Sequence, residues 1–320
     1  MRTAGAIVLL AVILAAAAAP WLAPNEPNQR FEQLMSAPPT RVHVAGGGHI
    51  YPQRVVSLRE RTFTEDRSRT VPLRWFADGR LVTADPATGA PLLLLGADGY
   101  GRDIFSRLLY GARATLLVAV IATLGATLLG ALIGGISGHS AGWLDAALSR
   151  ITEFVLVLPA IYVALSLRAV MPLVLSATTV FLLLTGIFTL LGWPVVARGV
   201  RAIVLAERER DYAMAARAAG AGTTRLLSRH LLPAASGYIL TQATLLFPAF
   251  ILAEATMSFV GLGFPTDVAT WGTMLQEAAN VATLGDAPWA LAPAFAIFAV
   301  VLGVNLVLQG SGHTPVPLEP

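Results

Sequence analysis

The stretch TLLVAVIATLGATLLGALIGGI, residues 115–136, contains no charged side chain. A helix that crosses a bilayer needs about 20 largely apolar residues, because the hydrocarbon core is about 30 Å thick and each helical residue rises about 1.5 Å. This stretch therefore predicts a membrane-spanning helix. A similar length and a similarly low charge identify further membrane-spanning segments in the rest of the chain.

Five further segments meet these criteria, which predicts an all-α, polytopic bundle of six transmembrane helices. They lie near residues 4–22, 151–167, 173–194, 237–260 and 289–308. The first segment is short, follows Arg2 and ends in AAAAAP, so a cleaved signal peptide is the alternative interpretation. Its length favours an uncleaved anchor at residues 1–23.

The composition of the 320-residue chain indicates the same class of protein. Hydrophobic residues make up 55% of the chain and charged residues 13%, whereas soluble domains have roughly 45–50% hydrophobic and 25% charged residues. The mean hydropathy is +0.67. There is no Cys and no Lys, so all 22 basic residues are Arg. Thiolate chemistry, cysteine metal sites and a P-loop lysine are therefore excluded, and so is an ordinary Walker-type ATPase.

The arginine distribution predicts how the chain lies in a bacterial plasma (inner) membrane, since short cytoplasmic loops carry an excess of basic residues. Residues 195–232 contain seven Arg, which predicts a cytoplasmic loop. Counting outward from it places both termini and residues 139–150 inside, and the long segment after the first helix outside. The net charge of +3 is small and dispersed, which indicates membrane lipid rather than nucleic acid as a partner.

The outer segment, residues 24–97, predicts a small β-rich extracytoplasmic insert. VHVAGGGHIY has the pattern of two short strands around a glycine turn, and PLRWFADGRLVTAD has that of a second pair around Asp78-Gly79. The many Arg and acidic residues of the insert favour a solvated, salt-bridged surface over a ligand site.

Three more regions complete the expected domain organisation. Residues 98–113 have polar and apolar side chains on opposite faces, which predicts an amphipathic helix at the membrane interface. Residues 114–309 form the expected five-helix core, with the loop at 195–232, and residues 310–320 form a C-terminal tail.

The most informative stretch is ERERDYAMAARAAGAGTTRLLSRHLLPAA, residues 207–235. Its Ala-rich first part predicts a helix that ends at Gly220 and Gly222, and a second short helix is predicted from Thr224 to Leu232, before Pro233. Two short helices at a glycine corner suit insertion into a partner's groove, because small residues allow close backbone approach. An ordinary polar connector is the alternative, which explains the Arg residues but not the Ala-Gly-Pro arrangement.

These residues resemble a known family. The run AA-x-x-x-G, followed by nine residues and H-x-L-P, is similar to the cytoplasmic signature of permease subunits of ATP-binding-cassette importers. The similarity extends over most of residues 95–309, through GADGYGRDIFSRLLYGAR, LGWPVVARGVRA, EATMSFVGLGF and the WG of ATWGTMLQEA. Together they resemble the second permease of the dipeptide, oligopeptide and nickel group, with the fold of a type I importer permease.

The resemblance implies a transport subunit that is not an enzyme and binds no cofactor, with ATP and Mg on partner ATPase subunits. The implied partners are a second homologous permease, two ATP-binding-cassette ATPase subunits and an extracytoplasmic solute-binding protein. The residues that the resemblance assigns to the ATPase-coupling loop are Asp211, Ala215, Ala216, Gly220, Arg225, His230, Leu232 and Pro233. Met214 stands where the family usually has Glu, and Asp211 or Glu209 is the candidate replacement.

Outside the loop, Glu254 is a carboxylate within a predicted spanning helix, where an unpartnered charge costs at least about 2.5–3.5 kcal/mol. A role on the solute pathway or in gating is one interpretation, and interhelix packing is the other. Two other classes of function are alternatives to a permease subunit. An ion-gradient-driven secondary transporter typically has inverted repeats and charged or broken midplane helices, and a membrane-bound enzyme needs His, Asp or Glu at catalytic spacing. Neither pattern is clear in this sequence.

Overall fold

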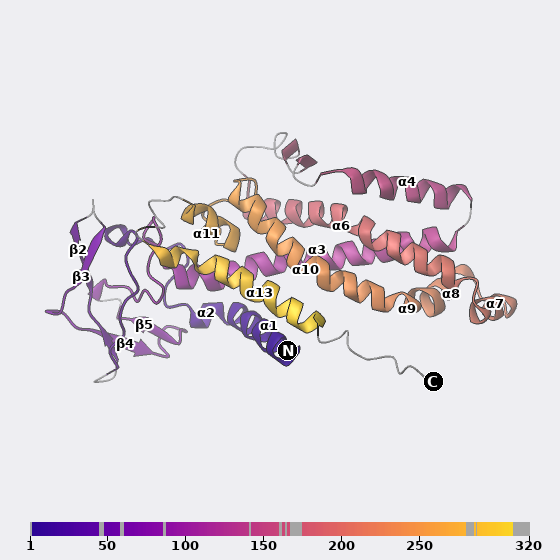
Figure 1. Ribbon diagram of the computed structural model, residues 1–320. Helices are drawn as coiled ribbons and strands as arrows, with labels where there is room; N and C mark the ends of the chain where they lie inside the picture. Colours follow the sequence, from indigo (N-terminus) through magenta and orange to yellow (C-terminus); the bar gives the residue numbers. More distant parts are fainter. Residues whose placement is uncertain are drawn as a thin grey trace, which may run out of the picture. The chain divides into compact units, whose positions relative to one another are not determined.

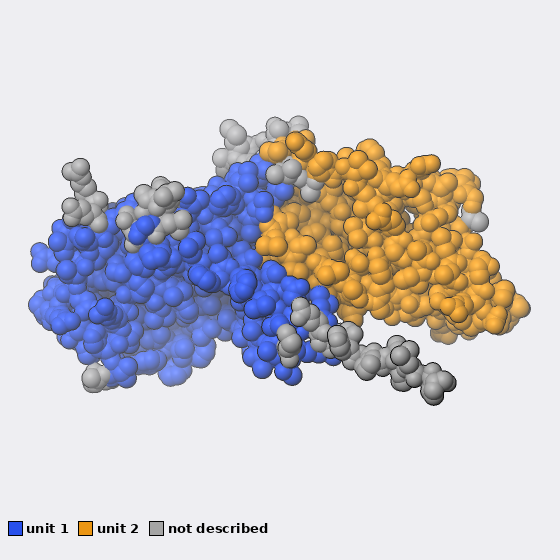
Figure 2. Space-filling model, viewed as in Figure 1, with its two compact units in different colours: residues 1–116, 254–320 blue, residues 117–253 orange. Residues whose placement is uncertain are grey.

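The structure is a computed structural model that describes residues 2–44, 48–57, 61–85, 88–140, 142–159, 162–163, 165–166, 175–279, 285 and 287–309. Its contacts divide the chain into two compact units, coloured blue and orange in Figure 2. Unit 1 holds Met1–Leu116 and Glu254–Pro320, and unit 2 holds Leu117–Ala253. Two long helices, α3 (Ile104–His139) and α10 (Ser236–Phe259), contribute residues to both units.

Within the residues that the structure describes, four helical segments are long and apolar enough to cross a membrane: α3, α6 (Ala177–Glu207), α10 and Pro288–Leu308. The last of these joins the 3₁₀ turn η4 (Pro288–Leu291) to α13 (Ala292–Gln309). They correspond to four of the six predicted spans. The predicted third span, 151–167, includes positions outside the described residues, and its first part lies in α4 (Trp143–Val157).

The predicted first span forms α1 (Arg2–Ala17) and, directly after it, α2 (Ala19–Leu22). In unit 1, α1 lies along α13 (Figure 1). Gly5 is buried in this contact, and a Cβ there would lie 2.5 Å from the carbonyl oxygen of Gly303. Small residues at the same level of two helices permit this backbone approach, which is the usual way in which helices associate in lipid.

Two small antiparallel sheets lie between α2 and α3. The strands are β1 (His49–Ile50), β2 (Gln53–Ser57), β3 (Thr62–Glu65), β4 (Val71–Trp75) and β5 (Val82–Ala84), arranged as β1-β4-β5 and β2-β3. The hairpin predicted around Asp78-Gly79 is confirmed, since Leu73 pairs with Ala84 and Trp75 pairs with Val82. The predicted glycine turn at 45–47 lies outside the described residues, and the β2-β3 hairpin was not predicted. A short 3₁₀ turn, η1 (Glu32–Leu34), precedes the strands.

The prediction of a separate amphipathic helix at 98–113 was wrong. Residues from Ile104 onward form the first turns of α3, which continues to His139. Asp103 precedes the helix, and its carboxylate accepts hydrogen bonds from the backbone N–H groups of Phe105 and Ser106 at 3.1 and 3.3 Å. This is the position of an N-cap residue, which satisfies donors that the first helical turn leaves free. The polar residues of the predicted segment 98–113 include Asp103, Ser106 and Arg107, and these three are buried within unit 1 and do not face solvent.

In unit 2, α3 packs against α6 through three glycines spaced four residues apart. A Cβ at Gly130 would lie 2.5 Å from the Val196 Cβ, one at Gly134 would lie 2.4 Å from the Ala197 carbonyl oxygen, and one at Gly138 would lie 2.7 Å from the Arg201 carbonyl oxygen. Glycines at this spacing allow two helix backbones to approach closely, so the tight contact extends over two turns of α3.

The helix α6 also continues beyond its predicted end. It passes through Pro194 and ends at Glu207, so residues 195–207, predicted as the start of the cytoplasmic loop, are helical. At about 1.5 Å per residue, a helix of 31 residues is about 47 Å long and exceeds the hydrocarbon core. The non-helical part of the loop is therefore shorter than predicted.

Candidate functional site

The corner motif, as we call residues 211–233, follows α6 directly. It consists of α7 (Asp211–Ala218), α8 (Thr223–Leu226), the π-helical turn η3 (Leu227–Leu231) and the start of α9 (Leu232–Ala234). The predicted end of the first helix at Gly220 is confirmed. Gly220 has a φ of +83°, its N–H donates to the Arg217 carbonyl, and the Ala221 N–H donates to the Ala216 carbonyl. This pair of bonds is a Schellman motif, which requires the left-handed conformation that glycine adopts without strain.

The second helix of the corner motif differs from the prediction. An α-helix was expected from Thr224 to Leu232, but only Thr223–Leu226 is α-helical, and Leu227–Leu231 forms a π-helical turn. Pro233 has no N–H to donate to the preceding turn, and its ring conflicts with the carbonyl four residues earlier. The wider π-helical turn therefore occupies the position where regular α-helical bonding fails.

The eight residues expected in the coupling loop divide into two groups by burial. The side chains of Ala216, His230 and Leu232 are half-buried, and the His230 ring centroid lies 6.2 Å from that of Tyr212. The remaining five are exposed: Asp211, Ala215, Gly220, Arg225 and Pro233. The structure therefore divides the motif into a solvent-facing corner and a side that faces the helix bundle.

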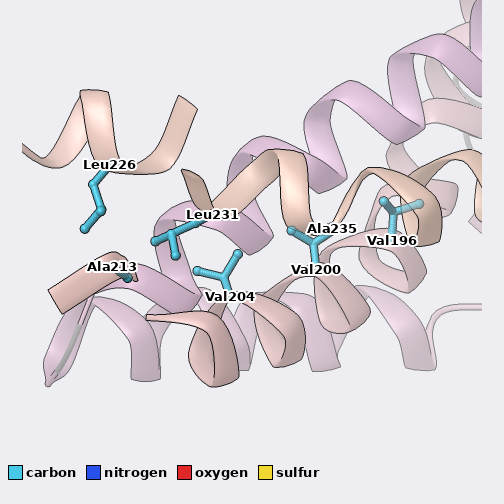
Figure 3. Close-up of a cluster of buried hydrophobic side chains, with 7 residues drawn as sticks. All are labelled: Val196, Val200, Val204, Ala213, Leu226, Leu231 and Ala235. Atoms are coloured by element: carbon cyan, nitrogen blue, oxygen red, sulfur yellow. The ribbon is translucent and has the colours of Figure 1, made fainter. Parts of the chain in front are cut away.

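The buried side of the corner motif is a hydrophobic cluster that joins it to α6 and α10 (Figure 3). Val204 of α6 lies beside Leu231 of the corner motif and Val200 lies beside Ala235, and Ala216 and Leu232 are partly buried against the cluster. Its seven buried members are Val196, Val200, Val204, Ala213, Leu226, Leu231 and Ala235. Because these side chains are nearly inaccessible to solvent, the corner motif is fixed to the end of α6 and does not hang from a free loop.

An ion pair that the sequence did not predict ties α4 to α6 in unit 2. The Arg201 guanidinium donates two hydrogen bonds of 2.7 Å to the Asp145 carboxylate, through Nε and Nη2. Ser137 of α3 donates a third, at 2.5 Å. The hydrogen bonds from Arg201 are the main cause that lowers the pKa of Asp145 to about 2. The sequence signal was an acidic residue and an Arg in two segments predicted to be cytoplasmic, 56 residues apart.

In unit 1, Glu254 of α10 has no exposed surface. Thr115 Oγ1 donates a hydrogen bond to Glu254 Oε2 and Ser258 Oγ donates one to Oε1, both at 2.8 Å. The two hydroxyl oxygens in turn accept the backbone N–H groups of Trp271 at 3.2 Å and Phe264 at 3.4 Å. The carboxylate thereby connects α3 and α10 to the start of α11 (Trp271–Ala278).

These features define a class of protein: a helical protein with several membrane-spanning segments and a compact helical corner fixed to the end of one of them. Comparison with known proteins gives the family. Residues 126–312 match the model described as binding-protein-dependent transport system inner membrane component. Residues 1–39 match the N-terminal TM domain of oligopeptide transport permease C.

Individual relatives agree with these matches. A Brucella ovis protein named as a peptide permease is 40% identical over 216 residues, which cover 67% of this chain and 70% of that protein. The dipeptide transport system permease protein DppC of Alkalihalophilus pseudofirmus is 36% identical, over 67% of this chain and 68% of its own. A Brucella suis protein named as a peptide transport system permease is 32% identical over 96% of this chain and 84% of its own.

The chain therefore belongs to the family of binding-protein-dependent transport system inner membrane components. It is a multi-pass inner-membrane permease subunit of an ATP-binding-cassette transporter, and it is a transport subunit rather than an enzyme. The corner motif and Glu254 both lie within the residues that match the family model.

Proposed function

We propose that this subunit imports peptides and that the corner motif is the surface on which a cytoplasmic ATPase subunit docks. The observation that carries the proposal is the exposed glycine corner at Gly220, fixed by buried side chains to the end of α6. A peptide as the solute is supported by the names of three relatives, two described as peptide permeases and one as a dipeptide permease. Nickel chelates are the alternative solute within the same group.

The proposed assembly contains this chain, a second homologous permease, two ATP-binding-cassette ATPase subunits and an extracytoplasmic solute-binding protein. ATP and Mg would bind the ATPase subunits, and this chain would hold no cofactor. Within the described residues, there is no group of three or more His, Cys, Asp or Glu side chains suited to a metal ion. In the proposed assembly, the contribution of this chain is mechanical.

In the proposed orientation, both termini and the corner motif are cytoplasmic, and the segment with β1–β5 lies outside. Six spanning helices give this arrangement, with α1 and α2 together as the first and residues 151–167, whose first part lies in α4, as the third. The helical run Arg2–Leu22, at about 1.5 Å per residue, is long enough to reach across about 30 Å of hydrocarbon. Its tight contact with α13 at Gly5 supports an uncleaved anchor.

Movement of a docked ATPase would pass through the buried cluster to α6 and α10, and through the Asp145–Arg201 ion pair to α4. Closely packed interiors move as rigid elements and not as continuously deformable material. A shift at the exposed corner would therefore move the cytoplasmic ends of these helices together. This is the step by which ATP hydrolysis would drive the change between outward and inward access.

For Glu254, complete burial favours the gating role over direct lining of the solute pathway. The carboxylate holds the turn after α10 and the first residue of α11 to α3, through Ser258 and Thr115. In the proposed orientation these residues lie toward the outer side. Glu254 would therefore position the segment that closes this end of the pathway.

The docking proposal is tested by Gly220→Asp. Among the described residues, no atom apart from Gly220 and its two chain neighbours lies within 4 Å of a Cβ at this position, so the new side chain has room within this subunit and adds a backbone strain of roughly 1 kcal/mol. We expect the two permeases to remain paired, and the ATPase subunits and solute-stimulated ATP hydrolysis to be lost. The measurement is recovery of the ATPases through a tagged permease, together with peptide uptake.

The matched control is Gly142→Asp. Gly142 has a φ of +76°, and in the described part of the chain no atom beyond its chain neighbours lies within 4 Å of a Cβ there, but it precedes α4 and lies outside the corner motif. The control should retain the ATPases and transport. If Gly220→Asp binds the ATPases and transports as wild type does, the corner motif is not the docking surface.

A further inference from the structure

The loop from Asp98 to Arg102, just before α3, presents Tyr100 at the surface of unit 1 with 49% of the residue exposed. Asp98 Oδ1 accepts hydrogen bonds from the backbone N–H groups of Tyr100 at 2.8 Å and Arg102 at 2.9 Å. Gly101 has a φ of +75°, and a Cβ there would lie 2.3 Å from the Phe31 carbonyl oxygen. The backbone on both sides of Tyr100 is therefore held in one conformation.

A charge cluster beneath the loop reinforces this geometry. Its four members, exposed by 8%, 3%, 0% and 7% of their side chains, are Asp98, Arg102, Arg107 and Glu277. Arg102 Nε lies 2.8 Å from Asp98 Oδ2, and Arg102 Nη2 lies 2.6 Å from Glu277 Oε2. Arg107 pairs with the same two carboxylates at 3.6 and 3.3 Å. Loss of any partner would leave a buried charge uncompensated, so the cluster resists rearrangement.

Two guanidinium groups flank the Tyr100 ring. The Arg102 Cζ lies 4.7 Å from the ring centroid and the Arg30 Cζ lies 5.9 Å from it. Both distances allow attraction between a cation and the face of an aromatic ring. Arg30 is exposed, and in the part of the chain that the structure describes it forms no ion pair. The buried cluster is neutral, and Arg30 adds an exposed positive charge beside the Tyr100 ring.

We propose that Tyr100 and Arg30 form a docking point for the extracytoplasmic solute-binding protein, on a surface of that protein with acidic side chains around a pocket for the tyrosine ring. Single exposed aromatic side chains are common on proteins, but this one is fixed before any partner arrives. Tyr and Arg are the residue types enriched among those that dominate binding energy, and a fixed side chain loses little entropy on binding. The inference rests on the proposed function, because it requires an importer whose unit 1 loop faces outward.

The test uses the assembled transporter, two permeases with two ATPase subunits, in lipid nanodiscs with the solute-binding protein of the same system. We expect Tyr100→Ala to weaken binding of that protein by at least tenfold and to lower its stimulation of ATP hydrolysis by a similar factor. Basal hydrolysis and the thermal unfolding temperature should not change. Tyr100→Phe keeps the ring and should retain most of the affinity.

Arg30→Glu provides a second, independent variant, because its exposed side chain leaves the loop intact. If the partner surface is acidic, Arg30→Glu should bind the solute-binding protein more weakly than wild type does. Added salt should then reduce the affinity of Arg30→Ala less than it reduces that of wild type. The matched control is Phe76→Ala, an aromatic residue that is 73% exposed and lies against Trp21 of α2, away from the charge cluster. It should bind as wild type does.

Wild-type affinity in both Tyr100→Ala and Arg30→Glu would overturn the docking point. That result differs from failure of the proposed function, in which the solute-binding protein would not stimulate even the wild-type transporter. A loss of affinity in Phe76→Ala equal to that in Tyr100→Ala would also overturn the assignment, because the effect would not be specific to the fixed loop.

Discussion

Glu254 illustrates how a single residue can combine burial with a defined set of partners. Its carboxylate only accepts hydrogen bonds, so both hydroxyl groups beside it must donate. The oxygen atoms of Thr115 and Ser258 are then free to accept backbone N–H groups from the segment that follows α10. The direction of every hydrogen bond in this group is therefore set by the acid.

Glu254→Gln keeps the shape of the side chain but replaces one acceptor oxygen with a donor. One of the two hydroxyls then loses its acceptor, and we expect a destabilisation of about 1–3 kcal/mol together with a loss of peptide uptake. Thr115→Val should also lower the stability and reduce peptide uptake. Thermal unfolding of the purified permeases and uptake in vesicles are the two measurements. Loss of uptake at unchanged stability would indicate a group on the pathway, and wild-type uptake would remove any functional role.

A pH dependence is expected from Asp145. Because its pKa is lowered to about 2 in the folded protein from an ordinary value near 3.9, its contribution is complete above pH about 4 and is lost as the pH falls toward 2. Asp145→Asn should therefore lower stability by about 1 kcal/mol at pH 7, allowing for screening by solvent. Unfolding of the wild type and of Asp145→Asn at pH 7 and pH 3 tests this, because the difference in stability between the two proteins should be smaller at pH 3.

The control for this experiment is Glu153→Gln. Glu153 forms an ion pair with Arg150 at 3.1 Å, but the two side chains are 61% and 85% exposed. Exposed pairs of this kind contribute little. A loss for Glu153→Gln as large as that for Asp145→Asn would argue against a special role for the half-buried pair between Asp145 and Arg201.

At the scale of elements, the contact between α3 and α6 depends on the absence of side chains along one stripe of α3. Gly134→Leu would place a branched side chain where even a Cβ lies 2.4 Å from the Ala197 carbonyl oxygen. The helices must then separate, and we expect destabilisation of about 3 kcal/mol or more, with loss of the assembled transporter. Size-exclusion chromatography and thermal unfolding measure the outcome.

The matched variant on another helix is Gly186→Leu, because no described atom outside the backbone of α6 and the neighbouring residues lies within 4 Å of a Cβ at that position. It should assemble normally. If Gly134→Leu assembles equally well, the glycine stripe does not determine how α3 packs against α6.

At the scale of the whole molecule, the prediction concerns orientation. The chain contains no Cys, so single Cys residues at Thr64 of β3 and Thr223 of α8 are the only thiols present in each variant. Both positions are exposed. In intact spheroplasts, an impermeant maleimide should label residue 64 and leave residue 223 unlabelled until the membrane is broken. The reverse pattern would invert the topology and place the corner motif away from any ATPase.

The sequence by itself determined the features that depend on neighbouring residues. Long uncharged runs require a membrane environment, and four of the six predicted spans are helices of sufficient length and hydropathy. The helix end at Gly220 and the turn at Asp78-Gly79 follow from local backbone preferences, because few residues other than glycine and Asn or Asp adopt positive φ at low cost. The family resemblance was likewise carried by a local stretch of sequence, the signature of the corner motif.

Only the tertiary structure decided which distant residues meet. Asp145 and Arg201 are 56 positions apart, Thr115 and Glu254 are 139 apart, and Arg107 and Glu277 are 170 apart. Periodicity indicates which face of a helix is apolar but not which polar side chain from another segment lies opposite it. The polar residues before residue 114 were therefore assigned to a separate interfacial helix, although partners far along the chain allow them to be buried at the start of α3. Burial with a partner is a property of the folded chain, and no local pattern encodes it.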